Sequence, residues 1–172
     1  MIGRTIALAA LGVFGAALFA ADKPVTVTLK DGTGKDVGTA KISSAAKGVK
    51  IALNLKGLTP GEHAVHIHTT AKCEGPAFTT AGGHFNPDSA HHGVNNTMTP
   101  KPHAGDMPNF TAKPDGTAKL TVTNAAVTLG EGSNSVFANG GTALMIHAKA
   151  DDLMSDPAGN AGDRIACGTI TK

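Results

Sequence analysis

The stretch VKIALNLK (residues 49–56) places an apolar side chain at every second position. Side chains of a β-strand point alternately to its two faces, so this spacing predicts a strand with one buried face. The same period of two returns in VTVTLK (25–30), LTV (120–122) and TALMIHA (142–148). A helical spacing of apolar residues is nowhere sustained beyond two turns, so the chain is predicted to consist mainly of strands.

Turn-forming segments separate these stretches. They are rich in Gly, Asn, Asp and Pro, as in DGTGKDVG (31–38), GLTPGE (57–62), KPDGT (113–117) and ANGG (138–141). Short strands separated in this way indicate an all-β fold, either an antiparallel sandwich or a barrel. Residues 69–112 and 149–165 lack the strand pattern. Connections of that length in a compact domain are usually functional or disordered, and two long functional loops are expected here.

The composition argues against some classes of function and favours others. The chain has 172 residues, which suits a single domain, with 15 Lys and Arg against 13 Asp and Glu, and it contains no Trp or Tyr. A nucleic-acid partner is not expected, because binding one needs clustered basic residues and aromatic side chains for stacking. All eight histidines lie between His63 and His147. This concentration directs attention to metal or proton chemistry.

The first residues have the pattern of a leader. Arg4 precedes an uncharged run over residues 5–21 that ends in LFAAD. This is typical of a signal peptide over residues 1–20, removed near Ala20 or Ala21 to leave an exported domain of residues 21–172. The alternative is a retained membrane anchor, since the run is at the lower limit of length for spanning a bilayer. After cleavage, no membrane association is expected.

Histidines first cluster in GEHAVHIH (61–68). On a strand, His66 and His68 would project from one face about 7 Å apart, with Val65 and Ile67 facing the core. Two such imidazoles form half a site for a metal that accepts nitrogen ligands in a tetragonal arrangement. A His-x-His pair alone is a weak signal, because buried histidines are often structural.

Two further segments strengthen the metal hypothesis. GGHFNPDSAHHG (82–93) and KPHAGDMPNF (101–110) together supply His84, His91, His92, His103 and Asp106. Three imidazoles and one carboxylate form a closed set typical of structural zinc, the alternative being scattered surface histidines. His147, in ALMIHAKADD (143–152), would complete a copper-like set with the two histidines of residues 61–68.

Five ordered motifs resemble those of the copper/zinc superoxide dismutases. They are HAVHIH (63–68), GGHFNP (82–87), HAGD (103–106), IHAKADD (146–152) and GDRIACG (162–168), and the similarity runs from about Val25 to Thr171. The loop segments resemble the bacterial, periplasmic branch. The resemblance implies a Greek-key antiparallel β-sandwich or barrel. It also implies a periplasmic location, or secretion in an organism that is not Gram-negative, and either a monomer or a homodimer.

The resemblance assigns two sets of metal ligands. The copper ligands would be His66, His68, His84 and His147, and the zinc ligands His84, His92, His103 and Asp106. Two four-coordinate metals need eight positions, whereas the motifs supply seven side chains. One ring must therefore serve twice, which an imidazolate with two ring nitrogens can do, and the resemblance assigns this bridge to His84.

Further roles follow from the same resemblance. Asp151 would accept hydrogen bonds from one copper-ligand and one zinc-ligand histidine. His63 would be structural, and His91, the neighbour of a ligand, is expected to be a surface residue. Cys73 and Cys167 would form a disulfide, the alternative being two free thiols.

The activity implied is disproportionation of the superoxide anion to O2 and H2O2. Copper would be the redox metal and zinc a structural one. Arg164 would attract and bind the anion beside the copper, and His84 would deliver a proton. The alternative is a periplasmic protein of the same fold that binds or buffers copper and zinc without catalysis.

Overall fold

The structure is a computed structural model that describes residues 23–98 and 102–172. The predicted signal peptide of residues 1–20 lies outside the described residues. Within the described ranges, no helix combines the length and apolar character that crossing a bilayer requires.

The described residues form nine strands and two short 3-10 turns, which confirms the all-β prediction. The strands are β1 (Val25–Asp31), β2 (Asp36–Ser44), β3 (Val49–Leu55), β4 (Gly61–His63), β5 (Val65–His68), β6 (Phe110–Ala112), β7 (Ala118–Asn124), β8 (Thr142–His147) and β9 (Arg164–Ile170). The turns are η1 (Thr79–Ala81) and η2 (Ala138–Gly140).

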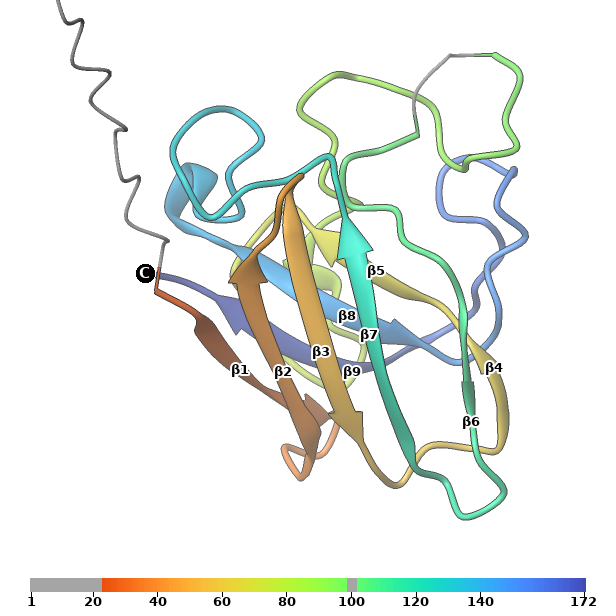
Figure 1. The fold of residues 1–172 in the computed structure, drawn as a ribbon. Coiled ribbons are helices and arrows are strands. Elements are labelled where there is room, and N and C mark those ends of the chain that lie inside the picture. Colours follow the sequence, from red (N-terminus) through yellow and green to blue (C-terminus); the bar gives the residue numbers. More distant parts are fainter. Residues whose placement is uncertain (1–22, 99–101) are drawn as a thin grey trace, which may run out of the picture.

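Seven strands form one curled antiparallel sheet (Figure 1), in the order β5-β8-β9-β1-β2-β3-β7. β4 and β6 pair separately, and only Ala64 stands between β4 and β5, so the small sheet continues directly into the edge of the large one. β7 and β8 follow one another in the chain but are separated by four strands in the sheet. A connection that crosses the barrel end in this way is a Greek-key feature.

Strand β3 has the predicted alternation. Its odd-numbered residues are buried and its even-numbered residues exposed. Ile51 lies opposite Ile42 of β2 and Val122 of β7, and all three side chains belong to the main hydrophobic core. Leu144 of β8 adds to this core from the other half of the sheet. The core therefore fixes β5 and β8, which carry three of the predicted metal ligands.

The two predicted long loops are present, with boundaries that differ slightly from the prediction. The first loop connects β5 to β6, and the second loop connects β8 to β9. Residues 110–112 were predicted as loop but form β6, and Arg164 begins β9. β6 has only three residues, too few to show a period of two, and it owes its conformation to pairing with β4.

A disulfide fastens the first loop to the sheet. Cys73 and Cys167 are bonded across 94 residues, as the resemblance implied, and Cys167 lies in β9. Closing a loop of this length restricts the unfolded chain and stabilises the fold by about 4–5 kcal/mol in the chain-entropy account. The first loop is thereby held to a central strand of the sheet.

Replacing Ile51 with Ala should lower the free energy of unfolding by about 2–5 kcal/mol, because a fully buried side chain leaves a cavity. Lys50→Ala, an exposed change on the same strand, is the matched control and should alter it by no more than about 0.5 kcal/mol. Urea unfolding with the disulfide intact measures both. Equal losses in the two variants would contradict the assigned faces of β3.

Candidate metal centre

The strands β5 and β8 bring the first histidines together. His66 and His68 lie on β5, and His147 ends β8, which pairs with β5. His84, in the first loop, forms an isolated antiparallel bridge with His68. All four rings are buried, and their nitrogens lie within 4.8 Å of one another. We call these four residues the first ligand group.

Hydrogen bonds at the far side of each ring decide which nitrogen faces the centre of the first ligand group. His68 Nδ1 donates to the carbonyl of Gly82 at 2.9 Å, and His147 Nδ1 to that of Gly162 at 3.2 Å. The opposite nitrogens, His68 Nε2 and His147 Nε2, lie 3.4 Å apart. Such bonds fix the tautomer and leave the inner nitrogen as a lone-pair donor. The inner nitrogens are therefore the atoms of this group that could bind a metal ion.

The second ligand group, His84, His92, His103 and Asp106, is formed within the first loop. Asp106 Oδ1 lies 2.8 Å from His84 Nδ1, 3.0 Å from His92 Nδ1 and 3.4 Å from His103 Nδ1. Ligands about 2.0–2.1 Å from a tetrahedral zinc ion are separated by about 3.3 Å. The 3.4 Å separation matches this value, whereas the 2.8 and 3.0 Å separations are hydrogen-bond lengths, so these side chains would move apart by a few tenths of an ångström to hold zinc.

His84 is common to both groups. Its Nδ1 belongs to the second group, whereas its Nε2 is buried and has no hydrogen-bond partner. Nδ1 of His66 in the first group is likewise buried and unpaired, and the two rings are 4.0 Å apart. Buried polar nitrogens without partners are rare. These two unpaired nitrogens are therefore consistent with one metal position between them.

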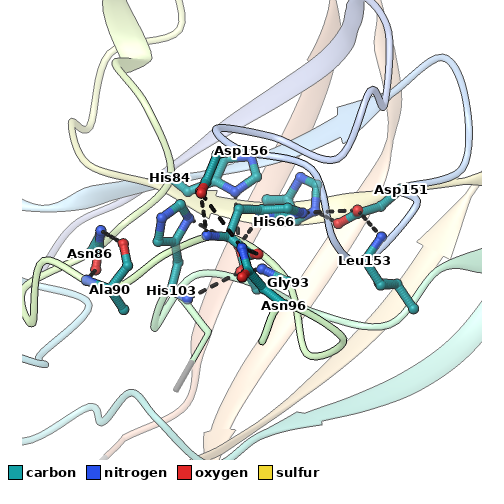
Figure 2. Close-up of polar contacts among 12 residues, drawn as sticks. His66, His84, Asn86, Ala90, Gly93, Asn96, His103, Asp151, Leu153 and Asp156 are labelled. Carbon is teal, nitrogen blue, oxygen red and sulfur yellow. Dashed lines mark hydrogen bonds and ion pairs between the residues drawn. The ribbon is translucent and has the colours of Figure 1, made fainter. Parts of the chain in front are cut away.

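Asp151, from the second loop, hydrogen-bonds to one histidine of each ligand group (Figure 2). Its carboxylate accepts from His66 Nε2 at 2.8 Å and from His92 Nε2 at 2.9 Å. Asn109 holds the main chain of Asp151 at both its N–H and its carbonyl, at 2.9 and 2.8 Å. Gly159 lies so close to the carboxylate that a Cβ there would collide with it.

Burial lowers the pKa of the histidines in the first ligand group. It lowers the pKa of His84 and His147 to about 4 and that of His68 to about 2. These rings are neutral at pH 7 in the metal-free protein, and neutral imidazole is the form that binds metals.

The second ligand group carries charge. Burial would raise the pKa of Asp106, but hydrogen bonds from the surrounding imidazoles outweigh it and hold that pKa far below its ordinary value. Burial also opposes protonation of His92, yet the carboxylates of Asp106 and Asp151 raise its pKa to about 9. The metal-free group therefore pairs an imidazolium with carboxylates, and a cation at its centre would replace the proton on His92 Nδ1.

The sequence was compared with known proteins. The profile of the family described as copper/zinc superoxide dismutase (SODC) matches residues 37–170. The chain belongs to this family.

Individual relatives agree with the family match. Superoxide dismutase (Cu-Zn) 2 of Aquifex aeolicus is 47% identical over 156 residues, which cover 90% of each chain. Superoxide dismutase (Cu-Zn) 1 of the same organism is 48% identical over 139 residues, 80% of this chain and 81% of its own. A point mutant of an SOD-like protein from Bacillus subtilis superposes with a TM-score of 0.82 at 37% identity, covering 86% of this chain and 97% of its own. Copper and zinc are thus the metals that these residues are expected to hold. Four imidazoles suit copper, and three imidazoles with one carboxylate suit zinc.

Three other predicted residues lie around the centre. Arg164 begins β9 opposite His147, and its Nη1 donates to the carbonyl of Phe78 at 2.8 Å. His63 is buried outside both groups, with Nδ1 2.7 Å from the carbonyl of His147. His91 is partly exposed, as predicted, and its Nδ1 hydrogen-bonds to the carboxylate of Asp156.

Of the residues that support the candidate ligands, Asp151 was predicted from the resemblance. Asn109, Asp156 and the carbonyls of Gly82 and Gly162 were not predicted. A main-chain carbonyl has no residue type, so it leaves no signal in the sequence. Asn109 lies within the quoted segment KPHAGDMPNF, but nothing in that segment distinguishes it from other polar loop residues.

Asp151→Asn should weaken metal binding about 10- to 100-fold, because an NH2 donor replaces one of the two oxygens that now accept from His66 and His92. Competition with a chelator measures the affinity of the metal-free protein for zinc and for copper. The neighbouring exposed acid provides the control, since Asp152→Asn should change neither affinity. Unaltered affinities in Asp151→Asn would remove its assigned role.

Proposed function

We propose that this chain catalyses the disproportionation of superoxide to O2 and H2O2, with copper in the first ligand group and zinc in the second. The observation that carries the proposal is the pair of complete four-residue groups that share His84. The family match supports superoxide as the substrate.

The metals supply chemistry that side chains lack. Copper, when bound, oxidises one superoxide to O2 and reduces a second one to peroxide. Zinc has no redox chemistry, and would neutralise the carboxylate of Asp106 and hold the first loop in position. His66, His68 and His147 would hold copper through Nδ1, Nε2 and Nε2, because their other ring nitrogens hydrogen-bond to oxygens.

His84 would bridge the two ions and handle a proton. Its Nδ1 faces Asp106, and its buried Nε2 faces the first group. When Nε2 is not a ligand it can hold a proton, which it would give to the peroxide product. The second proton that forms H2O2 would come from water.

Arg164 would bind the anionic substrate. Only one nitrogen of its guanidinium is used by the carbonyl of Phe78, so other N–H groups remain to donate to a diatomic anion. Its pairing with His147 in the β8–β9 ladder brings it next to the first group. The permanent positive charge of its guanidinium would attract a small anion toward this group.

Export belongs to the same proposal. Residues 1–20 would be a signal peptide and residues 21–172 the dismutase domain, located in the periplasm. The Cys73–Cys167 disulfide supports this location, because such bonds persist in oxidising compartments. Superoxide is the proposed small-molecule partner.

The purified domain should bind one copper and one zinc and dismutate superoxide. His147→Ala should abolish copper-dependent activity while zinc stays bound, because His147 belongs to the first ligand group alone. His91→Ala, which removes an imidazole from neither group, is the control and should keep activity and both metals. Superoxide decay after pulse radiolysis, together with metal analysis, measures these outcomes.

Survival of activity in His147→Ala would contradict the copper assignment. Full metal content without any dismutation would overturn the catalytic proposal in favour of a metal-binding or metal-buffering protein.

A further inference from the structure

The two long loops meet at the main chain of His92. Asp156, in the second loop, accepts a hydrogen bond from the His92 N–H, with 2.6 Å between nitrogen and Oδ1. Its Oδ2 accepts from His91 Nδ1, also at 2.6 Å. The carboxylate thus holds two consecutive residues of the first loop, and one of them is a proposed zinc ligand.

His92 is consequently held at three points. Its Nε2 donates to Asp151, its main-chain N–H donates to Asp156, and its Nδ1 faces Asp106. The second loop therefore supports both the ring and the backbone of this ligand. With those two points fixed, the ring has one orientation that directs Nδ1 into the second ligand group.

The loops are packed closely on both sides of this contact. Gly93 adopts φ +92°, and a Cβ on it would collide with the carbonyl of Leu153. Asn95 N–H donates to the same carbonyl at 2.9 Å. Asn96 Nδ2 lies 3.0 Å from the carbonyl of His92 and 3.2 Å from that of Met154. A shift of the second loop is therefore transmitted to His92.

The bond to the main chain of His92, and not the bond to the side chain of His91, is the contact that positions the ligand. The side chains of His91 and Asp156 are 40% and 39% exposed, and side-chain contacts with that much access to water contribute little to stability. The bond from the His92 N–H to a carboxylate is charge-assisted and short. It also acts on a residue whose side chain is fully buried.

We propose that Asp156 is a positioning residue for the zinc site, and that it sets the zinc affinity of the second ligand group by holding the main chain of His92. This inference rests on the proposed function, which assigns zinc to that group. Through Asp156 and Asp151, the loop between β8 and β9 supports a ligand on the other loop at two separate points.

Asp152, in the same loop as Asp156, forms hydrogen bonds only within that loop among the described residues. Its Oδ1 accepts from the main-chain N–H groups of Met154 and Ser155, and its Oδ2 accepts from Asn160. All these partners belong to its own loop. Asp156 accepts instead from residues of the other loop, His91, His92 and Asn96. Asp152 is therefore a control of equal charge in the same loop.

The experiment measures zinc affinity in copper-free protein, by competition with a chelator, for Asp156→Ala, Asp156→Asn, Asp152→Ala and His91→Ala. Asp156→Ala should bind zinc about 10-fold or more weakly, as for other residues that orient ligands. Asp156→Asn should bind zinc with nearly the wild-type affinity, because its amide oxygen can still accept from the His92 N–H. Asp152→Ala and His91→Ala should also keep nearly the wild-type zinc affinity.

Cobalt(II) in the second group gives a second readout. Its visible absorption reports the ligand geometry, and it should change in Asp156→Ala but not in Asp156→Asn or Asp152→Ala. A loss of stability without any change at the site would leave this spectrum unaltered.

Wild-type zinc affinity and an unchanged cobalt spectrum in Asp156→Ala would overturn the inference, as would equal losses of affinity in Asp156→Ala and Asp152→Ala. Failure of the unchanged protein to bind zinc would instead contradict the proposed function, so the two failures are distinguishable.

Discussion

The shared ring of His84 is the constraint on which the rest of the centre depends. One buried imidazole has to present Nδ1 to a carboxylate and two histidines and, at the same time, Nε2 to three other histidines. Both nitrogens can be used only if the two ligand groups lie on opposite sides of the ring. The strands deliver most of one group, and the first loop delivers the other.

This requirement explains why so much of the structure serves to immobilise loops. The disulfide ties the first loop to β9, and the bridge between His84 and His68 ties it to β5. Asp151 and Asp156 hold it from the second loop. A site formed from loops can be as precise as one formed from strands when each ligand has its own support.

The strands were predicted from the sequence, and the residues proposed as ligands lie together in the two groups, for separate physical reasons. Apolar residues alternate with polar ones in residues 49–55 because one face of the strand is buried and the other is exposed. The ligand motifs are specific because a metal accepts few residue types. The supports were harder to predict. Asp156 differs from Asp152 only in which loop it contacts, and that depends on how two long connections fold against each other. The short strand β6 was missed because its conformation comes from its partner β4.

The central claim, that one imidazole joins two metals, is tested most directly by electron paramagnetic resonance of protein with copper(II) in the first ligand group and cobalt(II) in the second. A bridging His84 couples the two spins, so the copper signal seen with zinc in the second group should be lost when cobalt replaces zinc. Independent copper and cobalt signals of full intensity would contradict the account.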